Sequence, residues 1–239
     1  MSDIHITLQG KGGVGKTLVS SILAQYFNEK FDTVSCIDTD PVNATFYQYD
    51  ALNVERLEIM DGSKINERNF DSLMEKLLTN EDEGVCWVID NGASSFVPLS
   101  SYLIENGAIQ MLTEAGHNVI IHTVITAGLD TLQGFSHLAE QFDSSANIVV
   151  WKNEFFGEIE VDGKSLEEMK VFTDNKKRVQ AVLTIHSQNA DTFGKDMESM
   201  LSNKMTFDEA IESGDFQVMA KQRLKMMKAN IFNQMKLIF

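Results

Sequence analysis

The sequence predicts an α/β fold, in which helices cover both faces of a mostly parallel sheet. Two observations predict it. Short apolar runs alternate with longer segments of helical periodicity along the 239 residues, as in strands joined by crossover helices. A glycine-rich stretch, residues 10–17, follows the first apolar run directly. Because ligands of such sheets lie at the carboxyl ends of the strands, both observations place a binding site at one edge of the sheet.

The remaining elements follow in order, with boundaries uncertain by a few residues. We expect strands over residues 4–9, 33–37, 57–60, 85–89, 118–126, 147–151 and 179–185. We expect helices over residues 16–29, 67–79, 99–106, 128–142, 191–203, 206–212 and 215–236. With two prolines and no Pro/Gly/Ser-rich linker, the chain is expected to form a single domain over residues 1–239.

The glycine-rich stretch has the composition of a phosphate-binding loop. Four glycines stand within seven residues, although glycine is costly to order; they are Gly10, Gly12, Gly13 and Gly15. Residues 10–17 fit the pattern G-x-x-x-x-G-K-[ST], in which backbone N–H groups at a helix N-terminus hold an anion. Lys16 would neutralise the β- and γ-phosphates, and the Thr17 hydroxyl would ligate Mg²⁺. The alternative is a glycine-rich turn that only packs a helix on a strand.

Acidic residues follow two of the predicted strands. Asp38 and Asp40 follow the second strand in "SCIDTDP", so one could hold magnesium waters while the other activates the attacking water. Asp90 directly follows the strand "VCWVI" and is a second candidate for holding the magnesium ion. The alternatives are an acidic turn that caps the next element, with Pro41 ending the strand, and an ordinary turn after Asp90.

A later strand, "NIVVW", leads to Asn153. Its amide could read the edge of an adenine base, or it could cap a turn. The residues alone leave these two interpretations open.

Composition excludes several classes of protein. The formal charge of −15 argues against a general nucleic-acid binder, so contact with DNA would need a local basic patch. Cys36 and Cys86 lie in apolar runs without a Cys/His cluster, which favours reduced core thiols. The chain shows no secretory signal and no membrane-spanning apolar run, so we expect a cytoplasmic protein.

The last segment is basic and amphipathic, at about residues 215–239. Its cations are Lys221, Arg223, Lys225, Lys228 and Lys236. Its apolar stripe at helical spacing consists of Leu224, Met227, Ile231, Met235 and Ile238. One interpretation is a final helix docked on the sheet. The other is a surface helix that contacts anionic lipid or DNA.

The stretch "KGGVGKT" resembles the deviant Walker A motif of the ParA/MinD family of dimeric ATPases, whose hallmark is an early lysine, here Lys11. In that family this lysine reaches the nucleotide of the partner subunit. The resemblance extends to "DTDP", "VIDNG" and "WKN". It implies a P-loop NTPase fold of the SIMIBI type that binds ATP or ADP with Mg²⁺ and hydrolyses ATP slowly, with stimulation by a partner.

The resemblance also implies roles for individual residues. It implies that Lys11, Lys16 and Asp40 are catalytic. It also implies that Thr17, Asp38 and Asp90 hold Mg²⁺ or its bound waters. The expected nucleotide contacts are Gly10, Lys11, Gly12, Gly13, Val14, Gly15, Lys16, Thr17, Leu18 and Asn153. Three departures stand out: Leu18 where many relatives have a second hydroxyl residue, Val42 where chromosomal partition proteins have Gln, and His186 where many relatives have proline.

Longer stretches, including "CIDTDPVNATFYQYDALNV" and "IDNGASSFVPLSSYL", resemble TraL-type proteins of conjugative plasmids. This implies an ATP-dependent homodimeric switch that acts in plasmid conjugal transfer or maintenance, with an unidentified protein of plasmid transfer or DNA processing as its partner. The alternatives on the same scaffold are a small-molecule ligase or kinase and a membrane-surface positioning ATPase. An iron–sulfur reductase is a further alternative, but it would need exposed cysteines.

Overall fold

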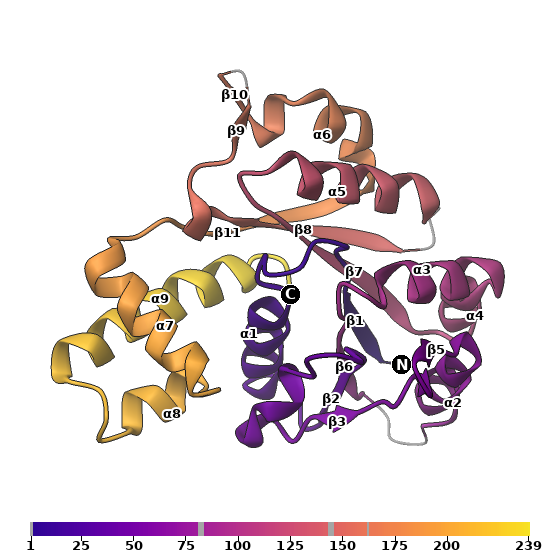
Figure 1. Ribbon diagram of the computed structural model, residues 1–239, viewed down its shortest axis with the longest axis horizontal. Coiled ribbons are helices and arrows are strands. Elements are labelled where there is room, and N and C mark those ends of the chain that lie inside the picture. Colours follow the sequence, from indigo (N-terminus) through magenta and orange to yellow (C-terminus); the bar gives the residue numbers. More distant parts are fainter. Residues whose placement is uncertain (1, 81–83, 143–145, 162) are drawn as a thin grey trace.

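A seven-stranded sheet organises the chain in the computed structural model, which describes residues 2–80, 84–142, 146–161 and 163–239 (Figure 1). The strand order is β11-β8-β7-β1-β6-β2-β3, and every pairing in it is parallel. The strands are β1 (Asp3–Thr7), β2 (Val34–Asp38), β3 (Glu55–Arg56), β6 (Cys86–Asp90), β7 (Asn118–Ile125), β8 (Asn147–Asn153) and β11 (Val179–Ile185). The predicted α/β class is confirmed, and all seven carboxyl ends meet at one edge.

Helices cover both faces of this sheet. One face carries α1 (Lys16–Asn28), α7 (Lys195–Ser202), α8 (Phe207–Glu212) and α9 (Val218–Met235). The other carries α2 (Asp71–Thr79), α3 (Phe96–Glu105), α4 (Ala108–Glu114), α5 (Leu129–Gln141) and α6 (Lys170–Asn175). Side chains of one strand alternate between the faces: Cys86 and Val88 face α1, whereas Trp87 and Ile89 face α3 and α4.

Shorter elements connect these layers. Two antiparallel hairpins pair β4 (Met60–Asp61) with β5 (Lys64–Ile65) and β9 (Glu160–Val161) with β10 (Lys164–Ser165). Single 3₁₀ turns lie at Phe46–Gln48, Asp50–Leu52, Glu67–Phe70, Glu154–Phe156, Leu166–Glu168 and Lys176–Arg178. A π-helical turn, Ala190–Gly194, leads into α7.

The predicted strand over residues 57–60 is wrong. The chain instead pairs with β2 through β3 (Glu55–Arg56) and then leaves the sheet. Leu57 and Ile59 are apolar because they are buried in the cluster that contains α2 and α3. The Leu57 N–H still donates to the Asp38 carbonyl oxygen at the end of β2, and the Ile59 carbonyl oxygen accepts from the Asn66 N–H beside β5. Sequence periodicity cannot distinguish a short buried connection from a short strand.

Other boundaries differ for identifiable reasons. The sequence predicted the third helix from residue 99, but α3 begins at Phe96. Pro98 lies in its first turn, where no N–H has an intrahelical partner, so the proline does not delay the helix. Helices α4 and α6 and both hairpins were not predicted, because each is only one or two turns or two residue pairs long.

Helix α9 docks on the sheet. Its residues Leu224, Ile231 and Met235 are buried against α1 and β11. Lys228 Nζ lies 2.7 Å from Asp208 Oδ1 and 2.8 Å from a carboxylate oxygen of Glu29, and Arg223 pairs with Asp196. The packing agrees with the docked interpretation of the C-terminal segment. No helix among the described residues is both long and apolar enough to cross a membrane.

Two buried histidines join the centre of the sheet to the C-terminus. Trp151 Nε1 donates to His122 Nδ1 at 3.0 Å, so the His122 proton resides on Nε2, which lies 2.9 Å from His5 Nδ1. Burial lowers the pKa of His5 to about 3, so both rings are neutral. The rings of Phe27 and Phe239 pack against His5.

The two cysteines lie where the sequence predicted. Cys36 and Cys86 are buried and free, and burial raises the pKa of the Cys36 thiol to about 12. A thiol held in its neutral form by an apolar environment is a poor nucleophile and a poor metal ligand, so these residues belong to the core.

Candidate functional site

The glycine-rich loop joins the carboxyl end of β1 to the N-terminus of α1. Gly13 and Gly15 adopt φ angles of 73° and 102°, in the left-handed region that glycine tolerates best. A Cβ atom on Gly15 would lie 2.8 Å from Asn153 Nδ2. The loop therefore needs glycine there both for backbone conformation and for space, and it leaves the helix N-terminus open to an anion.

Lys16 is a buried cation directed along this loop. Its side chain is 8% exposed, and Nζ donates to the Lys11 carbonyl oxygen at 2.9 Å. Burial lowers the pKa of Lys16, while the Asp90 and Asp40 carboxylates act in the opposite direction. A cation beside a glycine-rich loop at a helix N-terminus is suited to a polyphosphate.

Four oxygen-bearing side chains lie near Lys16 at the ends of β2 and β6 and the start of α1. Thr17 Oγ1 donates to Asp90 Oδ2 at 2.7 Å, and Ser20 Oγ donates to Asp90 Oδ1 at 2.8 Å. Asp38 is fully buried at the end of the neighbouring strand and accepts from the backbone N–H groups of Asp40 and Tyr47.

The charges of these carboxylates are incompletely balanced. Burial, reinforced by Asp38, raises the pKa of Asp90 to about 7, although the bonds from Thr17 and Ser20 and the charge of Lys16 lower it. Burial also raises the pKa of Asp38. Hydroxyl and carboxylate oxygens are the ligands that Mg²⁺ prefers, and a cation would offset this buried negative charge. The residues present fit a magnesium site.

The loops that follow β2 and β6, which carry "DTDP" and the end of "VIDNG", are tied to each other. Thr39 donates from its backbone N–H to the Asp90 carbonyl oxygen at 2.9 Å and from Oγ1 to Asn91 Oδ1 at 2.9 Å. The Asp40 carboxylate accepts from the N–H of Val42, and it packs so closely on Gly92 that a Cβ there would lie 2.5 Å from Asp40 Cγ. Any movement of one loop must therefore affect the other.

Unlike Lys16, Lys11 points away from the loop and lies at the surface. Its Nζ lies 2.8 Å from Asp130 Oδ2 in the first turn of α5, and the side chains are 53% and 66% exposed. Gln9 supports the base of the loop, because its Nε2 donates to the carbonyl oxygens of Val124 and Thr131 and its Oε1 accepts from the Lys11 N–H. Gly134 provides the space, since a Cβ there would lie 2.3 Å from Gln9 Oε1.

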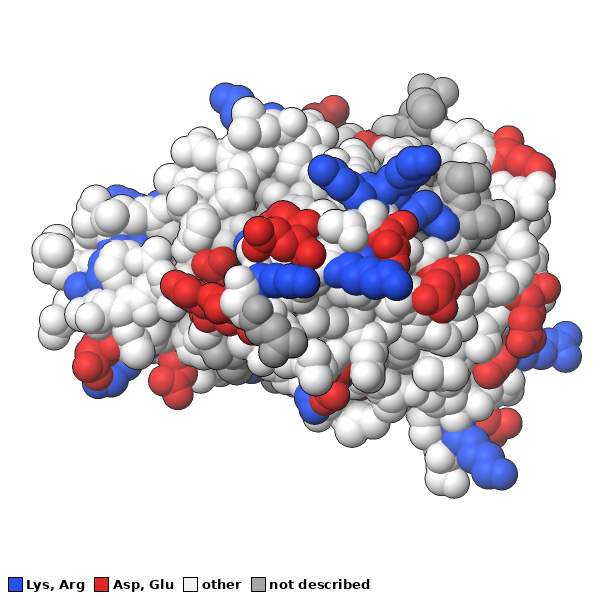
Figure 2. Space-filling model, turned by 90° about the horizontal axis from the view of Figure 1, so that it is seen from above, with Lys and Arg blue, Asp and Glu red and all other residues white. Residues whose placement is uncertain are grey.

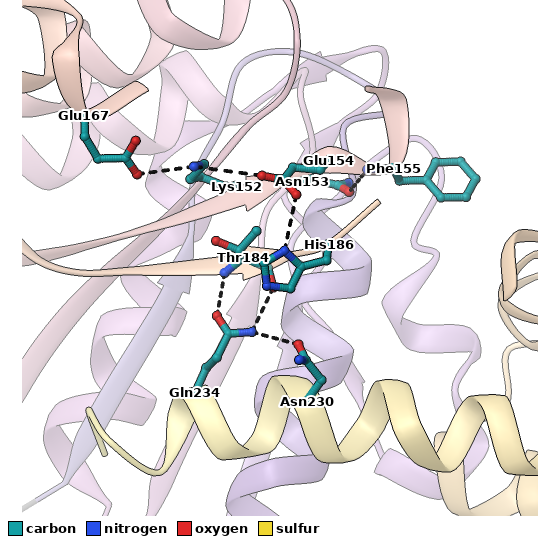
Figure 3. A network of polar contacts seen from close by, with 9 residues as sticks. All are labelled: Lys152, Asn153, Glu154, Phe155, Glu167, Thr184, His186, Asn230 and Gln234. Atoms are coloured by element: carbon teal, nitrogen blue, oxygen red, sulfur yellow. Dashed lines mark hydrogen bonds and ion pairs between the residues drawn. The ribbon is translucent and has the colours of Figure 1, made fainter. Parts of the chain in front are cut away.

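A mostly apolar cavity of about 490 Å³ adjoins the loop on the other side. It extends from Gly13, Gly15 and Leu18 past the ends of β8 and β11 to α7 and α9. Asn153 and His186 line it at these strand ends (Figure 3). A cavity next to a phosphate loop offers room for the nucleoside of a nucleotide.

Within this cavity, Asn153 is bonded to its own chain. Its Nδ2 donates to the Val14 carbonyl oxygen at 2.9 Å, and its Oδ1 accepts from the Phe155 N–H at 3.2 Å. The amide thus fixes the loop to the end of β8. Its predicted role in reading a base remains a prediction.

The structure brings most of the predicted site residues to one edge. Lys16, Thr17, Asp38, Asp90 and Asn153 are all buried or half-buried there, while the Lys11 side chain turns outward to Asp130. Sequence reasoning missed four residues that build the site: Gln9, Ser20, Asp130 and Phe155. Asp130 and Phe155 each follow a strand end closely, which is a signal that could have identified them.

Comparisons with known proteins agree with this geometry. Residues 6–206 match the family described as "CobQ/CobB/MinD/ParA nucleotide binding domain". Two proteins named "Protein TraL" from Escherichia coli are 50% and 48% identical to the chain. The first match covers 98% of both chains, and the second covers 99% of this chain and 98% of the relative.

Solved structures with the same fold include the MinD cell division protein of Aquifex aeolicus, with a TM-score of 0.51, 13% identity and 97% of both chains covered. They also include a putative plasmid partition protein, BB_S35, of Borrelia burgdorferi B31 bound to AMPPNP. Its TM-score is 0.52 at 18% identity, with 100% of both chains covered. At this level of identity the likeness shows the fold.

Proposed function

This chain belongs to the CobQ/CobB/MinD/ParA nucleotide-binding domain family, and from that premise we propose that it is an ATP-hydrolysing homodimeric switch. We further propose that it acts in the cytoplasm, in plasmid conjugal transfer or maintenance. One observation carries the biochemical part: Lys16, Thr17 and Asp90 converge at the N-terminus of α1, beside a cavity that can hold a nucleoside.

The nucleotide would lie along the loop. Backbone N–H groups of residues 10–18 and the Lys16 ammonium bind the phosphates, and the nucleoside enters the cavity beside Asn153. Thr17, Asp38 and Asp90 would hold Mg²⁺, directly or through water. When bound, the ion neutralises charge that develops on the β- and γ-phosphates.

Asp40 is the proposed catalytic acid–base residue. It follows β2 at the same edge as Lys16, and its charge acts on that lysine. A carboxylate there can orient a water molecule and accept its proton. Because Asp40 packs on Gly92, loss of the γ-phosphate would be transmitted to both tied loops.

The surface around the loop supports assembly with a second copy. Val42, Val97 and Leu129 are exposed large apolar side chains next to Asp40, at the start of α3 and beside Asp130. Exposed apolar groups around a functional edge are typical of an interaction surface. In the proposed dimer, Lys11 leaves Asp130 and reaches the partner's nucleotide.

The biological process rests on the relatives. The resemblance to TraL-type proteins, with about half of the residues identical, supports plasmid transfer over a metabolic ligase or kinase. Docking of α9 removes most of its apolar stripe from the surface, which does not favour a membrane-positioning role. We also propose that residues 1–239 act as one domain, since α9 returns to pack on α1 and β11.

The test is the mass in solution, measured by light scattering with Mg²⁺ and either ADP or ATP. We expect a monomer with ADP and a dimer with ATP. The Asp40→Ala variant should hydrolyse ATP far more slowly and accumulate as the ATP-bound dimer. Asp50→Ala, an exposed acid in the same segment, is the control and should behave as the unmutated protein.

Two results would contradict the proposal. If Asp40→Ala binds ATP but stays monomeric, nucleotide does not control assembly. If Asp40→Ala hydrolyses ATP at the normal rate, the catalytic role belongs to another residue, with Asp38 the next candidate.

A further inference from the structure

Three fully buried polar side chains form a cluster between the loops that follow β2 and β6. They are Thr39, Asn91 and Ser95, and none of them was among the predicted site residues. Asn91 Oδ1 lies 2.9 Å from Thr39 Oγ1 and 2.8 Å from Ser95 Oγ. Because Ser95 directly precedes α3, one amide oxygen joins the loop after β2 to the start of that helix.

The other end of the Asn91 amide fixes its orientation. Nδ2 donates to the Gly92 carbonyl oxygen at 3.1 Å, whereas the reverse orientation would set two oxygens against each other. Oδ1 therefore faces the two hydroxyl groups, and its two lone pairs allow it to accept from both at once. Since a buried polar group is costly to leave without a partner, the three side chains of the cluster hold one another in place.

Each hydroxyl group of the cluster has a further acceptor within reach. Thr39 Oγ1 lies 3.0 Å from the Asp90 carbonyl oxygen, and Ser95 Oγ lies 3.2 Å from the Thr39 carbonyl oxygen. A hydroxyl group carries one proton, so each donates either to the amide oxygen or to a carbonyl oxygen. Both acceptors of Thr39 belong to the segment of Asp90 and Asn91. The cluster can therefore shift while the Thr39 hydroxyl keeps the two loops joined.

The cluster bears directly on Asp40, the proposed catalytic residue. Thr39 precedes Asp40 in the chain, and Gly92, which follows Asn91, packs against the Asp40 carboxylate. The hydrogen bond that this carboxylate accepts from the Val42 N–H lies within its own loop, so it does not fix that loop relative to β6. The contacts of Thr39 cross between the two loops, and the position of Asp40 at the site therefore depends on them.

We propose that Asn91 is a positioning residue for ATP hydrolysis, which holds Asp40 in place through the Thr39 hydroxyl. The inference rests on the proposed function and adds the group that places its catalytic carboxylate. A misplacement of about 1 Å can lower the rate of a reaction about a hundredfold. Loss of this contact should therefore lower kcat, whereas the affinity for the nucleotide depends on the glycine-rich loop and Lys16 and should be retained.

The first experiment replaces the Thr39 hydroxyl by a methyl group. Thr39→Val should lower kcat about tenfold at saturating Mg-ATP, measured by phosphate release. The Kd of Mg-ATP, measured by calorimetry, should stay within about twofold. The fold should persist, because the backbone N–H of residue 39 still donates to the Asp90 carbonyl oxygen. Rates are compared at a protein concentration at which light scattering gives both proteins the same fraction of dimer.

Further variants assign the effect to the hydroxyl group and to Asn91. Thr39→Ser keeps the hydroxyl and should keep kcat within about threefold, and Thr173→Val, at an exposed threonine of α6, is the control and should leave kcat unchanged. Asn91→Leu should lower kcat about as much as Thr39→Val. The double variant should be no slower than the slower single one, because two residues that share one interaction do not act additively.

Several outcomes would overturn the inference. They are an unchanged kcat in Thr39→Val, a Thr39→Ser variant as slow as Thr39→Val, a parallel loss of affinity for Mg-ATP, and effects of Thr39→Val and Asn91→Leu that multiply in the double variant. If the unmutated protein does not hydrolyse ATP, the proposed function itself is wrong. If it does, and the Thr39 variants hydrolyse ATP equally fast, the proposed function stands and the positioning by Asn91 fails.

Discussion

At the scale of single residues, Lys16 is a buried cation whose ammonium group donates to a backbone carbonyl oxygen, that of Lys11. We expect Lys16→Ala to weaken Mg-ATP binding at least about tenfold, since a charge-assisted hydrogen bond is worth about 1.5–3 kcal/mol. Calorimetry measures this. Lys64→Ala, an exposed lysine on the β4–β5 hairpin, should leave the affinity unchanged, and equal affinities in the two variants would refute the phosphate-loop assignment.

Asp90 makes stability depend on pH. Its pKa is raised from 3.8 to about 7, so between these values the folded state holds a proton that the unfolded state has released. Its contribution to stability is therefore present at low pH and is lost as the pH rises through 7. Above that pH the buried charge costs on the order of 4 kcal/mol, at about 1.4 kcal/mol per pKa unit.

The Asp90→Asn variant removes that charge. Without nucleotide or Mg²⁺, it should raise the melting temperature relative to the unmutated protein more at about pH 8 than at about pH 5. With Mg-ATP the unmutated protein should have the higher melting temperature, because the ligand stabilises it more than it stabilises Asp90→Asn. A difference between the two proteins that is the same at both pH values would show that Asp90 does not titrate in this range.

How far the sequence predicts the site depends on the distance between partners in the chain. Lys16, Thr17 and Asp90 were predicted because each belongs to a local pattern with a known chemical role. The Lys11–Asp130 pair and the Gln9 contacts with Val124 and Thr131 join segments more than a hundred positions apart. No local pattern encodes them, and they follow only from the order of the strands.

At the scale of elements, Gln234 shows how α9 is held against the sheet. Its amide makes two hydrogen bonds with the Thr184 backbone on the edge strand β11, much as a neighbouring strand would. We expect Gln234→Ala to lower the free energy of unfolding by about 1–2 kcal/mol, as measured by urea denaturation. Asn233→Ala, exposed on the same helix, is the control, and an equal loss in both variants would reject this role.

The sequence predicted best those elements that are long enough to show a clear hydrophobic pattern. Helix α5 and strands β7 and β8 bury one face or a continuous run and were found almost in full. Helix α6 and the hairpin β9–β10 are held by tertiary contacts such as that of Phe172 with Phe135. Their short sequences carry too little periodicity to be recognised.

At the scale of the whole molecule, the Lys11–Asp130 pair bears on the proposed dimer. The pair is exposed and contributes little to stability, and in the proposed dimer Lys11 would have to leave it. We expect Asp130→Asn to shift the ATP-dependent monomer–dimer equilibrium toward dimer, measured by light scattering, with an unchanged melting temperature.

Lys11→Ala should still bind ATP but lose both dimerisation and hydrolysis.

Two outcomes would contradict these roles of Lys11 and Asp130. Normal assembly and hydrolysis by Lys11→Ala would remove the lysine from the mechanism. Weaker assembly of Asp130→Asn would mean that Asp130 supports the dimer.

The distribution of charge on the surface affects how strongly the protein attracts a polyanion such as DNA. The chain is strongly acidic, and on the face seen in Figure 2 the Lys and Arg side chains lie among Asp and Glu side chains. Such mixing weakens the attraction of that face for a polyanion at physiological salt. On α9, Arg223 and Lys228 are likewise paired with acids. Neither the face seen in Figure 2 nor these two cations of α9 therefore favour direct contact with DNA.

The strand order has a consequence for synthesis on the ribosome. β1 is the middle strand, and its neighbours β6 and β7 end at Asp90 and Ile125. The segment that carries the glycine loop is made first but cannot complete its ladder until the nascent chain has grown past both neighbours. At about 5–20 residues per second, that delay lasts several seconds or more, during which β1 lacks at least one of its two neighbours and stays open to chaperones or to other nascent chains.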